Sequence, residues 1–131
     1  MKKLSETYKE LGIAFTFPIE IEDANGKLTY YEDSDNFWQR WERDAKGRPT
    51  YYENSNDYWC KSEYDADGNR TYYENSNDYW CKSEYDADVN RTYFENSNGY
   101  WYRYERDANV NETYCENSEG LKQGTPKIKA L

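Results

Sequence analysis

The sequence predicts an all-β fold: tandem β-hairpin repeats that form an elongated antiparallel meander, with a short N-terminal capping helix. Three observations support this prediction. A 21-residue unit recurs along the chain, marked by Thr-Tyr pairs that begin at positions 29, 50, 71, 92 and 113. Each unit contains two polar segments that are typical of turns. The runs between these segments are rich in Tyr, Trp and Thr, which favour strands.

Residues 1–28 are expected to form a cap that combines a helix with the first half-repeat. Near the N-terminus, Leu4, Tyr8 and Leu11 share one helical face, and a glycine directly afterwards, Gly12, suits the C-cap. The apolar residues that follow alternate as in a strand: Phe15, Phe17, Ile19 and Ile21. Because the end units of a repeat array must be covered, the helix is expected to lie over the first hairpin.

Residues 29–120 are expected to form the repeat domain, with one hairpin per unit. Turn residues gather at 54–57 and 65–69. The period is odd and cross-strand partners share a face, so one turn of each unit should be an even loop. The glycine-bearing turn suits a three-residue loop with a bulge. Val89 and Val110 replace that glycine in later units, which predicts that Gly68→Val is nearly harmless. If the site requires φ > 0, the same substitution should instead cost about 1–2 kcal/mol.

The last segment, residues 121–131, is predicted to be a mobile basic tail. The chain carries 26 acidic and 17 basic residues, for a formal net charge of −9. This charge argues against direct binding to nucleic acid or to an anionic membrane. No apolar run is long enough to span a bilayer, and no signal peptide is recognisable. Together with three cysteines and no C-x-x-C spacing, these features predict a cytoplasmic protein with free thiols.

Neither catalytic residues, nor a metal site, nor a cofactor is predicted, and the protein is not expected to be an enzyme. The chain has no histidine, which excludes histidine-based acid–base catalysis and histidine metal ligands. Its carboxylates recur identically in successive units, whereas a catalytic site is normally singular. The Asp-x-Asp-Gly segments lack the glycine and glutamate spacing of a calcium-binding EF-hand loop.

The stretch from Thr92 to Trp101, Thr-Tyr-Phe-Glu-Asn-Ser-Asn-Gly-Tyr-Trp, resembles short tandem aromatic repeats of bacteriophage and prophage proteins. The resemblance covers residues 29–120 and implies a phage-encoded protein, located in the cytoplasm of the host cell. The units are more distantly similar to the choline- and glucan-binding repeats of bacterial surface proteins. Through Tyr64-Asp65-Ala66-Asp67-Gly68, they also loosely resemble the Tyr-Asp repeats of secreted toxin shells.

Candidate binding residues come from the positions that recur in each unit. One tryptophan per unit forms a ladder, which can serve as a stacking platform for a ligand or as the core of a sheet that lacks aliphatic residues. The repeated carboxylates can mimic a nucleic acid in front of a basic groove, or can keep the sheet soluble. The candidate partner-binding residues are Trp59, Trp80, Trp101, Tyr58, Tyr79, Tyr100, Glu53, Glu74, Asp57, Asp78, Asp65 and Asp86.

The function expected from these patterns is non-enzymatic binding to a basic protein surface. The concrete form is a phage-encoded inhibitor of a host defence that targets nucleic acids, such as a CRISPR or restriction system. Its partner would be a host protein with a basic, nucleic-acid-binding surface, contacted by aromatic anchors ringed by carboxylates. Two alternatives stay open: a carbohydrate- or choline-binding module, and a structural repeat protein without a ligand. Unpaired sheet edges also leave self-association open.

Overall fold

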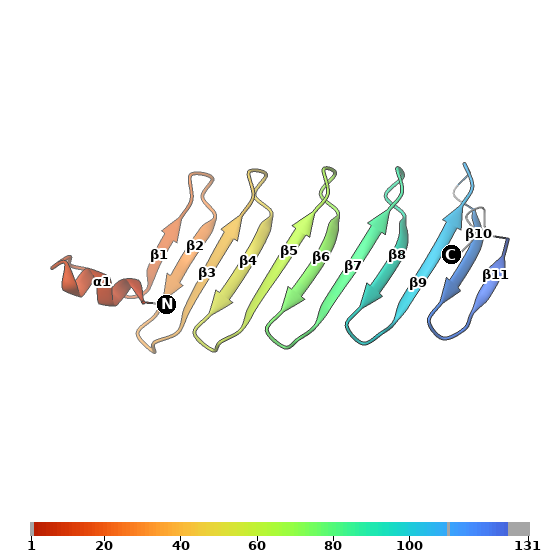
Figure 1. The fold of residues 1–131 in the computed structure, drawn as a ribbon. Coiled ribbons are helices and arrows are strands. Elements are labelled where there is room, and N and C mark those ends of the chain that lie inside the picture. Colours follow the sequence, from red (N-terminus) through yellow and green to blue (C-terminus); the bar gives the residue numbers. More distant parts are fainter. Residues whose placement is uncertain (1, 110, 126–131) are drawn as a thin grey trace. The chain divides into compact units, whose positions relative to one another are not determined.

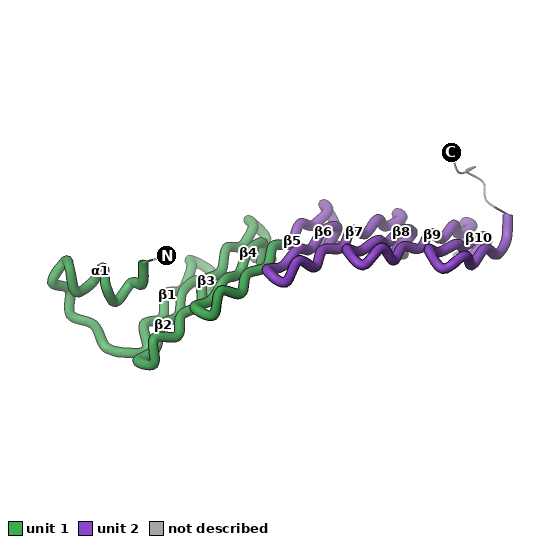
Figure 2. The backbone as a smooth tube through the Cα atoms, turned by 60° about the horizontal axis from the view of Figure 1, so that its bottom comes forward, with its two compact units in different colours: residues 1–61 green, residues 62–131 purple. Residues whose placement is uncertain are grey.

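The computed structural model describes residues 2–109 and 111–125, and within them one helix and eleven strands. The strands pair antiparallel in the order of the chain (Figure 1), which confirms the predicted all-β meander with a short N-terminal helix. The chain divides into two compact units, residues 1–61 and residues 62–131, which are drawn in different colours in Figure 2. Val110 and residues 126–131, which make up about half of the expected basic tail, lie outside the described residues.

The unit of residues 1–61 contains the helix and the first strands. Their bounds are α1 Leu4–Glu10, β1 Ile19–Glu22, β2 Leu28–Glu32, β3 Trp38–Arg43 and β4 Pro49–Asn54. β5 spans Trp59–Tyr64, so its first residues belong to this unit and its last residues to the next. The remaining strands belong to the unit of residues 62–131: β6 Arg70–Asn75, β7 Trp80–Tyr85, β8 Arg91–Asn96, β9 Trp101–Arg106, β10 Glu112–Asn117 and β11 Lys122–Gly124.

The core of the first unit lies beneath the helix. Ile19, Tyr30 and Trp38 are buried there, and Leu4, Tyr8 and Phe15 pack against them. The helix ends at Glu10, where Leu11 is the C-cap and Gly12 adopts the left-handed conformation with φ +69°. Leu11 therefore lies beyond the last helical turn and is 67% exposed, so its predicted place on the packed face is wrong.

The first strand is shorter than the alternation of apolar residues predicted. It begins at Ile19, directly after Pro18, which has no backbone N–H to donate to a neighbouring strand. Phe15 instead packs against the helix, with its ring 5.8 Å from that of Tyr8. At the other end of the chain, β11 pairs with β10, so the first residues of the expected mobile tail form a strand.

Both turns of the repeat have the same geometry. In the loop of residues 86–90, the Asp86 amide donates to Asn90 O at 2.9 Å and the Val89 amide donates to Asp86 O at 3.1 Å. In residues 96–100 the Asn96 amide and the Gly99 amide make the equivalent bonds. In both loops the first side chain accepts hydrogen bonds from the third and fifth backbone amides. We call these two classes the Asp loops and the Asn loops.

The expectation of one even loop per unit is therefore wrong, because both classes are three-residue loops. A bulge in the strand restores the odd period. Glu84 pairs with Tyr93 and Tyr85 pairs with Arg91, which leaves Thr92 without a cross-strand partner. The Thr92 hydroxyl donates to Glu84 O at 3.4 Å. The same threonine-to-carbonyl bond recurs at positions 29, 50, 71 and 113, which accounts for the threonine that marks each unit.

Wherever the structure describes it, the fourth residue of each loop adopts a left-handed backbone conformation. Gly68 has φ +88° and Val89 has φ +66°, so both occupy the left-handed region that a β-branched side chain resists. The site therefore has φ > 0 in both units, which is the condition under which Gly68→Val is expected to be costly. We expect Gly68→Val to lower the free energy of unfolding by about 1–2 kcal/mol, and Val89→Gly to raise it by about as much. Chemical denaturation measures both; no change in either variant would contradict the shared loop geometry.

Candidate functional site

The sheet has two distinct faces in every hairpin, and strand pairing sets which residues each face receives. In the β6–β7 hairpin, Glu74 lies opposite Trp80 and Tyr72 lies opposite Lys82. These four positions define the Trp face. Tyr73 lies opposite Cys81 on the other side, which we call the Tyr face. The Trp face is thus mixed and charged, whereas the Tyr face is lined by rings.

The glutamates of the Trp face are engaged by neighbours on the same face. The Tyr72 hydroxyl donates to Glu74 at 2.9 Å, and the Lys82 ammonium lies 5.3 Å from the centre of the Trp80 ring. Glu53 accepts hydrogen bonds from the Arg40 guanidinium at 3.0 Å and from the Tyr51 hydroxyl at 3.2 Å. Because these internal partners use the carboxylate oxygens, a ligand on this face would have to compete with them.

The copy of this arrangement in β10 shows its electrostatic effect. In β10, Glu116 accepts a hydrogen bond from the Tyr114 hydroxyl at 2.9 Å and another from the Arg103 guanidinium at 3.0 Å. Both bonds lower the pKa of the Glu116 carboxyl, and the bond from Tyr114 contributes more than the bond from Arg103. Burial raises the pKa of the Tyr114 hydroxyl. At Glu116, contacts within the sheet thus favour the ionised carboxylate.

The structure separates the twelve predicted site residues into four groups. Trp59, Trp80 and Trp101 lie beside Glu53, Glu74 and a third glutamate, Glu95, on the Trp faces of their hairpins. The tyrosines precede the tryptophans in sequence and belong to the Tyr face: Tyr58, Tyr79 and Tyr100. The aspartates lie in loops at opposite ends of the strands: Asp57 and Asp78 in Asn loops, Asp65 and Asp86 in Asp loops.

The aspartates that begin Asp loops have a local structural role. Asp86 accepts hydrogen bonds from the backbone amides of Asn90 and Asp88. The Asn90 amide is the main cause of the lowered pKa of the Asp86 carboxyl. Asp57 and Asp78 instead occupy the fourth loop position, with φ +64° and +63°, and their side chains are exposed. Asp or Asn suits this conformation better than most residues do.

Sequence reasoning missed the role of the loop serines. The Trp80 amide donates to Ser97 Oγ at 3.1 Å, and the Ser97 amide donates back to Trp80 O at 2.9 Å. Trp38 with Ser55 and Trp101 with Ser118 make the same pair of bonds. Each serine thus ties its Asn loop to the preceding hairpin. The constant serine that follows the first Asn of these loops was the available signal.

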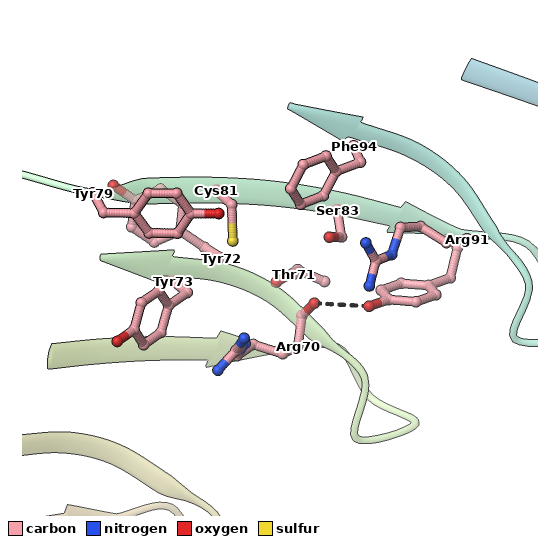
Figure 3. A pocket seen from close by; sticks show the side chains of 10 residues that line it. Arg70, Thr71, Tyr72, Tyr73, Tyr79, Cys81, Ser83, Arg91 and Phe94 are labelled. Atoms are coloured by element: carbon pink, nitrogen blue, oxygen red, sulfur yellow. Dashed lines mark hydrogen bonds between the residues drawn. The ribbon is translucent and has the colours of Figure 1, made fainter. Parts of the chain in front are cut away.

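A hollow on the Tyr face of the second unit was also missed (Figure 3). It has a volume of about 330 Å³, and the small side chains of Cys81 and Ser83 lie between its aromatic walls. The walls are Tyr73, Tyr79, Tyr85 and Phe94, and two arginines, Arg70 and Arg91, line it as well. The signal was the loss of bulk at positions 81 and 83, where the next unit has Tyr102 and Tyr104.

Other kinds of site find no support in the described part of the chain. Across residues 2–109 and 111–125, no three side chains of the metal-ligating types come together as an ion site would need. Over the same residues, no helix has the length and apolar character needed to cross a bilayer.

Comparison with known proteins identifies a similar fold. No family model matches the sequence, and no curated protein matches it. Among solved structures, the Tc holotoxin pore of Photorhabdus luminescens superposes with a TM-score of 0.55 at 20% identity, over 76% of this chain and 5% of that chain. The TcdB2-TccC3-Cdc42 complex gives 0.56 at 20% identity, over 86% of this chain and 6% of that chain. The present chain thus spans a small fraction of each toxin chain, and the likeness concerns the fold alone.

Proposed function

We propose that this protein is a non-enzymatic binding protein that docks the ends of its hairpins on a basic surface of another protein. The observation that carries the proposal is the state of the third residue of the Asp loops. Asp67 and Asp88 are exposed. No described residue forms a hydrogen bond or an ion pair with either carboxylate. These charges are thus available to a partner.

The position of these carboxylates strengthens their combined field. Within the second unit, the loops of residues 65–69 and 86–90 are separated by two strand spacings, or ~9.6 Å. This separation is close to the screening length of ~8–10 Å at moderate ionic strength, so the potentials of the two loops overlap. The strand glutamates add less, because internal arginine and tyrosine partners engage them. The loop ends therefore replace the sheet faces as the expected acidic surface.

The partner that fits this surface is a cationic protein groove that ordinarily holds nucleic acid. A phage-encoded inhibitor of a CRISPR or restriction nuclease would use the surface as a partial mimic of a phosphate backbone. The support for this form is the charge at the loops and the repeat resemblance given by the sequence. On this proposal, the protein acts in the host cytoplasm and does not contact nucleic acid directly.

The test combines inhibition assays with charge-removing variants. Purified restriction and CRISPR nucleases are assayed for DNA cleavage with increasing amounts of the protein. We expect inhibition of a susceptible nuclease to weaken by at least about tenfold in the double variant D67N/D88N. It should also weaken as salt rises from about 0.05 to 0.2 M. The matched control, D57N/D78N, removes the same charge from the other end of the hairpins and should inhibit like the original protein.

Two results would argue against this function. Equal losses in the two double variants would assign the effect to net charge rather than to the Asp loops. The absence of inhibition across the panel would favour a structural repeat without a ligand. Tight retention on choline or glucan resin would instead favour the carbohydrate-binding alternative.

A further inference from the structure

The hairpin formed by β8 and β9 fills its own Tyr face with two rings. The Tyr102 ring stacks on Phe94 at 5.5 Å between centres and 20° between planes. It also lies 4.9 Å from Tyr104 and 6.1 Å from Tyr100. The Arg91 guanidinium donates a hydrogen bond to the Tyr102 hydroxyl at 3.2 Å. This hairpin therefore holds a flat ring whose oxygen faces an arginine.

The hollow of Figure 3 is the same arrangement one unit earlier, without the two rings. Positions 21 residues apart place Cys81 and Ser83 where the next unit has Tyr102 and Tyr104. The residues around the filled site have counterparts in the hollow, each 21 residues earlier. Tyr73 corresponds to Phe94, Tyr79 to Tyr100 and Arg70 to Arg91. The hollow of about 330 Å³ thus lacks an aromatic ring that its neighbour supplies from the chain itself.

Polar groups in the hollow are left without partners. Ser83 is only 8% exposed, yet its hydroxyl makes no hydrogen bond with any described residue. Arg70 lies with its guanidinium 4.5 Å from the centre of the Tyr73 ring, and no described carboxylate forms an ion pair with it. An unpaired hydroxyl and an unpaired guanidinium beside an aromatic wall suit an acceptor with negative charge.

We propose that this hollow binds a small aromatic carboxylate with a single ring. The ring stacks on Tyr73 as Tyr102 stacks on Phe94, the carboxylate accepts hydrogen bonds from Arg70, and the Ser83 hydroxyl donates to the same ligand. A ligand ring can stack on Tyr73 without displacing Arg70. In the next hairpin, the Phe94 ring contacts the Arg91 guanidinium at 5.1 Å and stacks on Tyr102 at the same time. A cation such as choline is disfavoured, because guanidinium groups already lie over two of the rings.

The size of the hollow limits the ligand. Its volume lies at the lower end of the range of about 300–1,000 Å³ found for small-molecule sites. That space accommodates one ring with short polar substituents. The site concerns the Tyr face, whereas the proposed protein-binding surface lies at the Asp loops, so the two proposals can fail independently.

The first experiment measures ligand preference with the full chain. The probe is 4-hydroxybenzoate, followed by isothermal titration calorimetry and by saturation-transfer NMR. We expect one molecule bound per chain, and affinities at least about tenfold weaker for 4-hydroxybenzamide, which lacks the charge, and for cyclohexanecarboxylate, which lacks the aromatic ring. Equal binding of the acid and the amide, or no binding of the acid, would overturn the proposal.

The second experiment closes the hollow with the residues that the chain uses one unit later. The double variant C81Y/S83Y should fold, since β9 carries tyrosine at both equivalent positions, and should lose binding to the probe. E84Y adds a ring to the opposite face of the same strand and should bind normally. R70Q should abolish the preference for acid over amide, a readout that a purely structural role would not change. Binding that survives in C81Y/S83Y, with the fold verified by circular dichroism, refutes the assignment.

Discussion

Replacing Glu32 with alanine is expected to lower the free energy of unfolding by about 2–4 kcal/mol, because it leaves buried donors without an acceptor. Glu32 is 1% exposed and connects the helix to the sheet. Its carboxylate accepts hydrogen bonds from the Ser5 hydroxyl, from the Ser5 amide at 3.1 Å and from the Tyr30 hydroxyl at 2.8 Å. The Tyr30 oxygen in turn accepts from the Leu4 amide at 3.1 Å.

The repeat supplies a matched control for this variant. Glu53 occupies the position one unit later and also accepts hydrogen bonds from a tyrosine and from a basic side chain, but it is only half-buried. Glu53→Ala should therefore lower the free energy of unfolding by no more than about 1 kcal/mol. Urea denaturation of both variants measures the difference. A loss at Glu32 no larger than at Glu53 would show that the helix is not held by this carboxylate.

The same group predicts how stability depends on pH. Burial opposes ionisation of Glu32, but hydrogen bonds from Ser5 and Tyr30 outweigh it and lower the pKa from 4.5. Its contribution is thus complete above pH 4.5 and lost as pH falls through the lower, folded-state pKa. Burial chiefly raises the pKa of Tyr30 from 10.0 to about 12. That contribution is complete below pH 10.0 and lost as pH rises towards 12. Measuring the free energy of unfolding as a function of pH tests both losses. In E32Q, the loss of stability at acidic pH should be smaller.

A second large effect is expected for the tryptophan ladder, whose copies are not equivalent. Trp38 is 9% exposed and packs with Ile19 and Tyr30 beneath the helix, so Trp38→Ala should cost about 3–5 kcal/mol. Trp101 is only half-buried, so Trp101→Ala should cost about 1–2 kcal/mol. Both tryptophans keep their backbone bonds to a loop serine when the side chain is removed. Equal losses in thermal or chemical unfolding would contradict this gradient.

The contrast between these copies shows what the sequence could and could not predict. Strands and loops follow from short-range chemistry that every unit repeats, so their order was predictable from one copy. Burial depends on what packs over the sheet. The residues next to Trp38 and Trp101 in the sequence do not reveal this difference. Within the unit of residues 1–61, the helix packs against Ile19, Tyr30 and Trp38, which explains why Trp38 is buried although it shares its motif with half-buried tryptophans.

The candidate sites were predictable to a similar degree. The recurring pairs of Trp and Glu do meet, as at Glu74 and Trp80, because both lie in a simple hairpin register. The tyrosines were grouped with them although they precede the tryptophans by one residue and therefore point to the opposite face. The hollow depends on the absence of side-chain volume at Cys81 and Ser83. Motif searches look for residues that are present, so such a gap becomes visible only when the units are compared with one another.

The bulged threonine of each hairpin has a consequence for changes in the number of repeats. A gene duplication or deletion that adds or removes whole 21-residue units carries two loops and one bulge with it, so every side chain beyond it keeps its face. Deleting Thr92 alone would remove the bulge but keep the pairs on either side of it, because Arg91 would still lie opposite Tyr85 and the next residue, Tyr93, opposite Glu84. Deleting a paired residue such as Phe94 would instead shift the register by one and move every later side chain to the opposite face. Length changes that keep the two faces of the sheet are therefore whole units or the bulged residue itself.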